Sequence, residues 1–106
     1  MISITKDNLD KEMMNSDKPI IIDFSADWCY PCKEMSLIFE ELSKEIKDIK
    51  FVKIDVEEEP NLAVQFNVMS IPTFMIINKG DEVDRISGSM PKAIFKAKIQ
   101  DILKRI

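Results

Sequence analysis

Two cysteines, Cys29 and Cys32, are the residues of this sequence whose type and spacing could carry chemistry. They stand at the start of an expected helix, where a spacing of three brings two thiols within disulfide reach without backbone movement. Cys29 would lie near the helix N-terminus, where unpaired N–H groups and the helix dipole favour a thiolate. Cys32, about one turn further in, should be more buried and protonated. The pair predicts thiol–disulfide exchange, in which Cys29 attacks a substrate disulfide and Cys32 resolves the mixed disulfide.

The composition excludes several other kinds of chemistry. The 106 residues contain no histidine, which excludes Ser–His and Cys–His catalysis and removes the commonest metal ligand. Two cysteines are too few for a closed zinc site, and two glycines are too few for a glycine-rich phosphate loop. A net charge of -4 lacks the basic footprint of nucleic-acid binding. We therefore expect no nucleic-acid partner, no metal, and no cofactor beyond a redox-active Cys29–Cys32 disulfide.

Length and hydropathy indicate the class of protein. With 45% hydrophobic and 32% charged residues, the sequence is typical of a soluble globular protein, and we expect a single domain over residues 1–106. The first residues lack the organisation of a signal peptide, and the most apolar stretches fall far short of the ~18 residues that span a bilayer. The sequence therefore predicts a cytoplasmic monomer with no membrane contact. In that compartment a close cysteine pair indicates redox or metal chemistry more than a structural bridge.

The elements that must position the thiols follow from the apolar pattern. Residues 19–24 are a continuous apolar run broken only by Asp23, which predicts a central strand covered on both faces. Apolar residues then recur at steps of three and four from Met35 to Ile46, which predicts an amphipathic helix with Pro31 in its first turn. Further strands are expected at 2–5, 51–56, 73–77 and 82–87. Further helices are expected at 7–15 and at 60–66, the latter with Asn67 as a left-handed cap. The last helix should begin near Pro91 and bury Phe95, Ile99, Ile102 and Ile106. The order β-α-β-α-β-α-β-β-α predicts an α/β fold, with a central mixed sheet flanked by helices on both faces.

A resemblance to a known family rests on residues 23–33 (DFSADWCYPCK) and on the Ser-Ile-Pro-Thr of residues 70–73. These segments resemble the thioredoxin family, and the resemblance covers essentially the whole chain without an evident insertion. It implies the thioredoxin fold and the reduction of protein disulfides. It also implies two kinds of partner, namely disulfide-containing protein substrates and a flavin-dependent, NADPH-fed thioredoxin reductase as electron donor.

The resemblance also implies further site residues. It implies a cis Ile71–Pro72 bond facing the thiols, with backbone groups around Ile71 that pair with an extended substrate. The ordinary alternative is a proline that only delays the start of the next strand. Gly88 and Ser89 would border the substrate groove, although Gly88 could simply supply a turn. We expect Trp28 to be a packing and shielding ring beside the thiols, with substrate contact as its second role.

Asp23 is the one acid in the apolar run. Such a residue usually marks an exposed edge or a bulge, but its neighbours indicate burial, and the resemblance places it beneath Cys32. Burial would raise its pKa above the usual value of about 3.9 and let it exchange a proton with Cys32, through water. Lys53, on the adjacent strand, would tune Asp23 electrostatically or would simply be solvated.

Two residues depart from the family pattern. Tyr30 stands between the cysteines where the family usually has Gly, and Ser25 stands where it usually has Trp. Tyr30 adds a phenol at the rim, and with Trp28 and Pro31 we expect it to contact the substrate. Three alternatives stay open: a thiol oxidase or isomerase of the same fold, a non-catalytic binding module, and a metal or cluster site shared across a dimer. The missing export signal opposes the first, and the lack of further ligands opposes the last.

Overall fold

A computed structural model describes residues 1–14 and 16–106 of the chain. The elements follow one another in the order that the sequence predicts. They are β1 (Ile2–Ser3), α1 (Leu9–Met14), β2 (Ile20–Ser25), α2 (Tyr30–Glu45), β3 (Lys50–Asp55), α3 (Pro60–Gln65), β4 (Thr73–Asn78), β5 (Asp81–Ser87) and α4 (Lys92–Leu103). The expected end of the first helix, at Asn15, lies outside the described residues.

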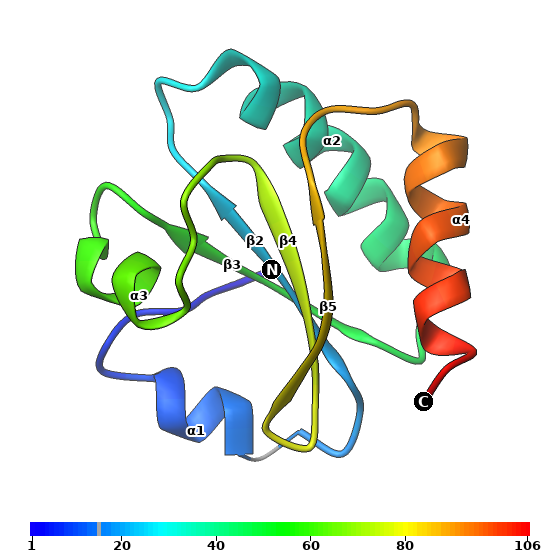
Figure 1. Cartoon of the computed structure of the whole chain (residues 1–106), viewed down its shortest axis with the longest axis horizontal. Helices are drawn as coiled ribbons and strands as arrows, with labels where there is room; N and C mark the ends of the chain where they lie inside the picture. Colours follow the sequence, from blue (N-terminus) through cyan, green and yellow to red (C-terminus); the bar gives the residue numbers. More distant parts are fainter. Residues whose placement is uncertain (15) are drawn as a thin grey trace.

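The five strands form one mixed sheet in the order β1-β3-β2-β4-β5. β3 runs parallel to both β1 and β2, whereas β4 is antiparallel to β2 and β5 is antiparallel to β4. Helices α1 and α3 lie on one face of the sheet, and α2 and α4 lie on the other (Figure 1). The structure therefore confirms the α/β class and the mixed sheet with helices on both faces.

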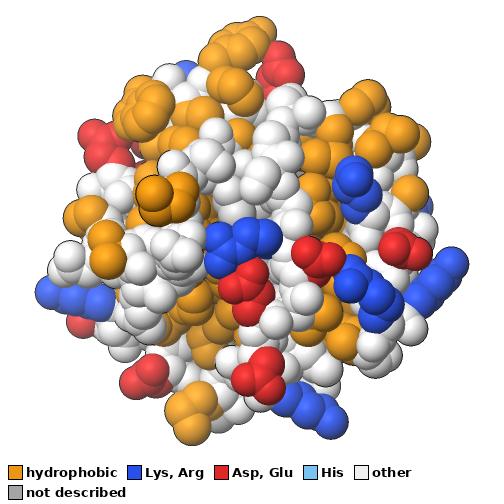
Figure 2. Space-filling view, in the orientation of Figure 1, with side chains coloured by type: hydrophobic (Ala, Val, Ile, Leu, Met, Phe, Trp, Pro, Cys, Tyr) orange, Lys and Arg blue, Asp and Glu red, His pale blue; other side chains and the backbone are white. Residues whose placement is uncertain are grey.

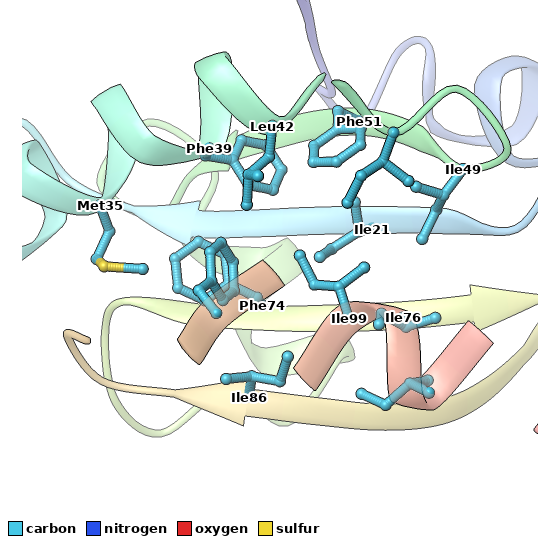
Figure 3. Packing of buried hydrophobic residues seen from close by; sticks show 13 residues of the cluster. Ile21, Met35, Phe39, Leu42, Ile49, Phe51, Phe74, Ile76, Ile86 and Ile99 are labelled. Carbon is cyan, nitrogen blue, oxygen red and sulfur yellow. The ribbon is translucent and has the colours of Figure 1, made fainter. Parts of the chain in front are cut away.

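Strand β2 occupies the centre of the sheet because its residues are apolar on both sides. Ile20, Ile22 and Phe24 pack with residues of α1 and the α3 region, and Ile21 packs with α2 and α4. The core between the sheet and helices α2 and α4 contains most of the aromatic pairs. In one of them the ring centroids of Phe74 and Phe95 are 4.5 Å apart. Figure 3 shows Met35, Phe39 and Leu42 pointing from α2 toward the sheet, and Phe74 among them. The central strand and the first long helix are thereby fixed against each other.

Helix α2 begins and ends where the sequence indicates. Cys29 is its N-cap and Pro31 lies in its first turn, where the fixed φ of proline suits a helix start. Its buried residues, Cys32, Met35, Phe39 and Leu42, recur at the predicted helical spacing. At 16 residues α2 is the longest helix among those listed above, and none of the helices in the described ranges has both the length and the apolar character to cross a membrane.

A few boundaries differ from the sequence predictions. The third strand ends at Asp55 and leaves Val56 just beyond it. Ile106 was expected to be buried, but it is 46% exposed because α4 ends at Leu103 and Ile106 lies beyond the end of the helix. That prediction was wrong, since a periodic pattern does not show where a terminal helix stops. Asn67, by contrast, has the expected left-handed conformation, with φ at 56°.

Candidate active site

Cys29 and Cys32 lie at the N-terminal end of α2, and their sulfurs are joined in a disulfide with a Cα–Cα distance of 5.2 Å. The backbone N–H of Cys32 donates a hydrogen bond to Sγ of Cys29 at 3.3 Å. This donor and the helix dipole both stabilise negative charge on Cys29 in the reduced protein. Cys29 is 6% exposed and Cys32 is 2% exposed, so the second thiol is the more buried, as predicted. The arrangement gives one sulfur that can act as a thiolate nucleophile and a second behind it.

The disulfide packs in a small apolar cluster. Ala26 is buried with the two cysteines, and the half-buried Val56 and Ile71 pack against this cluster. Sequence reasoning did not single out Ala26 and Val56 for the site. The one sequence signal for them was their position: each directly follows one of the parallel strands β2 and β3, whose carboxyl ends meet at one edge of the sheet. The cluster shields the sulfurs from most of the solvent.

The segment before β4 borders this cluster. The Ile71–Pro72 bond is cis, as the resemblance implied. The carbonyl of Pro72 accepts a hydrogen bond from the N–H of Gly88 at 3.0 Å, so Gly88 is brought to the same edge of the site. Gly88 has φ at 91°, a conformation that side-chain-bearing residues rarely adopt. Ser89, the next residue, is exposed and lies outside the packed cluster.

Two aromatic rings stand at the rim of the site. Trp28 is 69% exposed and Tyr30 is 71% exposed. The expectation that Trp28 is mainly a packing ring was therefore wrong: the turn before α2 carries it outward, away from the core. Figure 2 shows apolar side chains gathered at the upper end of the molecule, where α2 begins. The rim thus offers exposed aromatic surface next to the sulfurs.

Asp23 lies on the face of the sheet that α2 covers, between a charged residue on one neighbouring strand and an apolar residue on the other. Its register partners are Lys53 on β3 and Phe74 on β4. The side chain is 2% exposed, and its Oδ1 has no hydrogen-bond partner among the described residues. Burial raises the pKa of Asp23 to about 7, against the opposing effects of the Lys53 ammonium and the Ser25 side chain. A carboxyl group in this state can take up or release a proton near neutral pH.

A cavity of about 480 Å³ lies next to Cys32 and to the polar neighbours of Asp23, which is not itself among the residues that line it. Cys32 lines it together with Ser25 and Lys53, the two residues that flank Asp23 along β2 and across to β3. The exposed Lys53 therefore faces this water-accessible space and still acts on Asp23 through its charge. The cavity is polar and large enough to hold water, which can carry a proton between buried groups.

Comparisons with known proteins agree with this geometry. The profile of the family described as Thioredoxin matches residues 1–101. The chain is 44% identical to Thioredoxin C-3 of Corynebacterium nephridii over 89 residues, which is 84% of this chain and 61% of that protein. It is 38% identical to Thioredoxin Y1, chloroplastic, of Arabidopsis thaliana over 101 residues, which is 94% of this chain and 59% of that protein.

A third relative is matched over most of both chains. The thioredoxin of Rickettsia felis is 37% identical over 91 residues, which is 85% of this chain and 87% of that protein. By contrast, the chain spans only about three fifths of the length of the first two relatives. The sheet order, the helix-capping disulfide and the family match from residue 1 to residue 101 lead to one conclusion: this chain belongs to the thioredoxin family and has the thioredoxin fold.

Proposed function

We propose that this chain is a thiol–disulfide oxidoreductase that reduces the disulfide bonds of other proteins. The observation that carries the proposal is the Cys29–Cys32 pair at the N-terminus of α2, with the Cys32 N–H bonded to Sγ of Cys29. This geometry lowers the free energy of a thiolate at the outer cysteine and keeps the second thiol within reach of it. The relatives carry the name thioredoxin, which supports the same activity.

In the first step the thiolate of Cys29 attacks one sulfur of the substrate disulfide. The Cys29–substrate S–S bond forms while the substrate S–S bond breaks, and the other substrate sulfur leaves as a thiolate that takes a proton from water. The apolar cluster around Cys29 favours this exchange, because the mixed disulfide carries less charge than the thiolate it replaces.

In the second step Cys32 resolves the mixed disulfide. Its thiol gives a proton to the carboxylate of Asp23 through water, which the cavity beside Cys32 can supply, and the resulting thiolate attacks Sγ of Cys29. The Cys29–Cys32 disulfide forms while the Cys29–substrate bond breaks, and the second substrate sulfur leaves as a thiolate that takes a proton from water. Two electrons have then passed from this protein to the substrate. An external dithiol or a reductase returns two electrons and restores both thiols.

The proposed partners follow from this cycle. The substrates are proteins that present a disulfide on an extended segment, which pairs with the backbone at Ile71 and lies against Pro72, Gly88 and Ser89. Trp28, Tyr30 and Pro31 contact the substrate from the opposite side. A thioredoxin reductase supplies the electrons. We place this activity in the cytoplasm, where a reductase keeps such a pair reduced, and expect the chain to work as a monomer.

The proposal is tested by dithiothreitol-driven reduction of insulin with the wild type, Cys29→Ser and Cys32→Ser. We expect the wild type to catalyse reduction and both variants to lose catalysis, because each step needs its own thiol. Cys32→Ser should also accumulate a mixed disulfide with insulin, visible by non-reducing electrophoresis. An inactive wild type would contradict the proposed activity. A mixed disulfide trapped by Cys29→Ser instead would reverse the roles of the two cysteines.

A further inference from the structure

Arg85 links the outer strand β5 to the end of α3. Its guanidinium donates hydrogen bonds to the backbone carbonyls of Phe66 at 3.0 Å and Asn67 at 2.9 Å. The same group binds both carboxylate oxygens of Glu82, at 2.7 and 2.8 Å. Phe66 is the C-cap of α3, where carbonyls lack partners within the helix and a cation is favoured. The guanidinium of Arg85, on β5, therefore donates to carbonyl groups at the end of α3 that have no donor within the helix.

The end of α3 needs such support because the helix is short. It has six residues, and Leu62 is its one buried side chain. A helix of this length has little stability of its own, so its position depends on contacts with the rest of the fold. The left-handed Asn67 then turns the chain directly into the segment that leads to β4. Any movement at Asn67 is passed on to that segment.

The segment from Val68 to Pro72 is the one that carries Ile71 to the disulfide. Its far end is fixed, because the Thr73 hydroxyl donates to the carbonyl of Ser70 at 2.7 Å and the Gly88 N–H donates to that of Pro72. In between, the side chain of Met69 is 89% exposed. At the near end, the Val68 N–H donates to the carbonyl of Ala63 at 2.9 Å and the Val68 side chain packs on the core, and the bonds of Arg85 to the α3 terminus add a third hold.

We propose that Arg85 is a positioning residue for disulfide exchange, which fixes the near end of the 68–72 segment so that the backbone at Ile71 can pair with a substrate. The proposal deepens the proposed function and rests on it for its effect on activity. Arginine suits this role because its planar group can serve two carbonyls and one carboxylate together, whereas lysine offers a single ammonium. Arg85 acts through the loop and touches neither sulfur.

The test compares wild type, Arg85→Met, Arg85→Lys and Arg105→Met. Arg105 is a matched control: it also pairs with an acid of β5, Asp84, and makes none of the contacts to α3. Each protein is assayed with insulin, whose chain must pair with the loop, and with 5,5′-dithiobis(2-nitrobenzoate), a small disulfide that need not. Amide hydrogen exchange at residues 68–71 is measured on the same four proteins.

We expect Arg85→Met to raise the KM for insulin about fivefold and to leave kcat and the rate with the small disulfide within about twofold. Arg85→Lys should recover part of the loss, and Arg105→Met should behave as wild type. Exchange at residues 68–71 should become faster in Arg85→Met alone. Unchanged exchange and unchanged KM in Arg85→Met, or an equal effect in Arg105→Met, would overturn the proposal. An inactive wild type would contradict the proposed function, while the exchange data would still decide whether Arg85 positions the loop.

Discussion

Asp23 is an acidic residue at a buried position whose neighbours are mostly apolar and would favour an uncharged side chain. An acid at the centre of the sheet, 2% exposed and with one oxygen unpaired among the described residues, opposes folding whenever it is charged. Its Lys53 neighbour lies at the exposed edge of the cavity and compensates only in part. Such a cost, in the strand that leads directly to the cysteine pair, is typical of a group kept for its proton and not for its packing.

The pH dependence of stability should show this cost. Because the folded pKa of Asp23, about 7, lies above its ordinary value of 3.8, the folded state is favoured at acid pH and is progressively destabilised as pH rises from about 4 to about 7. The full difference corresponds to about 4 kcal/mol. We expect Asp23→Asn to be more stable than wild type by about 2–4 kcal/mol at pH 8, and the difference to shrink to near zero at pH 4. Urea unfolding at both values measures it.

The same variant should lose activity. We expect Asp23→Asn to slow insulin reduction about tenfold or more, because an amide cannot accept the proton of Cys32. Asp101→Asn, an exposed acid on α4, is the control and should change stability by less than about 0.5 kcal/mol. A variant that is both destabilised at pH 8 and fully active would contradict the role given to Asp23.

At the scale of elements, α2 and α4 hold the thiol-bearing end of the molecule in place. They pack side by side on one face of the sheet, and ion pairs of Lys92 with Glu41 and Glu45 join them at the surface. Pairs this exposed contribute roughly 0–1 kcal/mol each. The apolar cluster beneath the two helices must therefore supply most of the stability that fixes α2.

Two isoleucines of α4 allow a direct check. Ile99 is 0% exposed and Ile94 is 50% exposed in the same helix. We expect Ile99→Ala to lower the free energy of unfolding by about 2–5 kcal/mol, because it leaves a cavity under the helix. Ile94→Ala should change it by less than about 0.5 kcal/mol. Denaturant unfolding of the two variants gives the comparison, and equal losses would mean that α4 is not held by its buried face.

The sequence predicted those features that depend on local pattern. Three features follow from neighbouring residues: the central strand, the burial of Asp23, and the position of Cys29 near the N-terminus of α2. They do so because apolar spacing and the preference of proline for a first helical turn act over a few positions. The contacts of Arg85 do not, since they join residues 18 and 19 positions apart and depend on how α3 lies across the sheet. The exposure of Trp28 was missed for a similar reason: nothing in the sequence shows which way a turn points.

At the scale of the whole molecule, the charge is acidic and part of it lies near the thiols. The chain carries a net charge of -4, and Glu58 and Glu59 line the same cavity as Cys32. The exposed Asp27 lies next to the active-site turn. Fields of this kind attract cationic partners and repel anionic ones over about 10 Å at 0.1 M salt.

Salt should therefore affect differently charged substrates in opposite ways. With two synthetic peptides that contain one disulfide and carry flanking lysines or flanking glutamates, we expect the second-order rate constant for the cationic peptide to fall about threefold between about 20 and 300 mM NaCl. The rate constant for the anionic peptide should rise. Stopped-flow tryptophan fluorescence can follow both, and parallel salt dependences would show that the acidic residues play no part in encounter.

The outer strands of the sheet bear on how the protein behaves at high concentration. β1 has only two residues, and four of the seven residues of β5 are charged. Short or charged edge strands oppose the addition of strands from other molecules, by which β-proteins form fibrils. The exposed side chains of Trp28 and Tyr30 favour self-association. The edge strands β1 and β5, however, are too short or too charged to add further strands to the sheet. These two edge strands therefore oppose ordered aggregation of a molecule that exposes aromatic side chains at its reactive end.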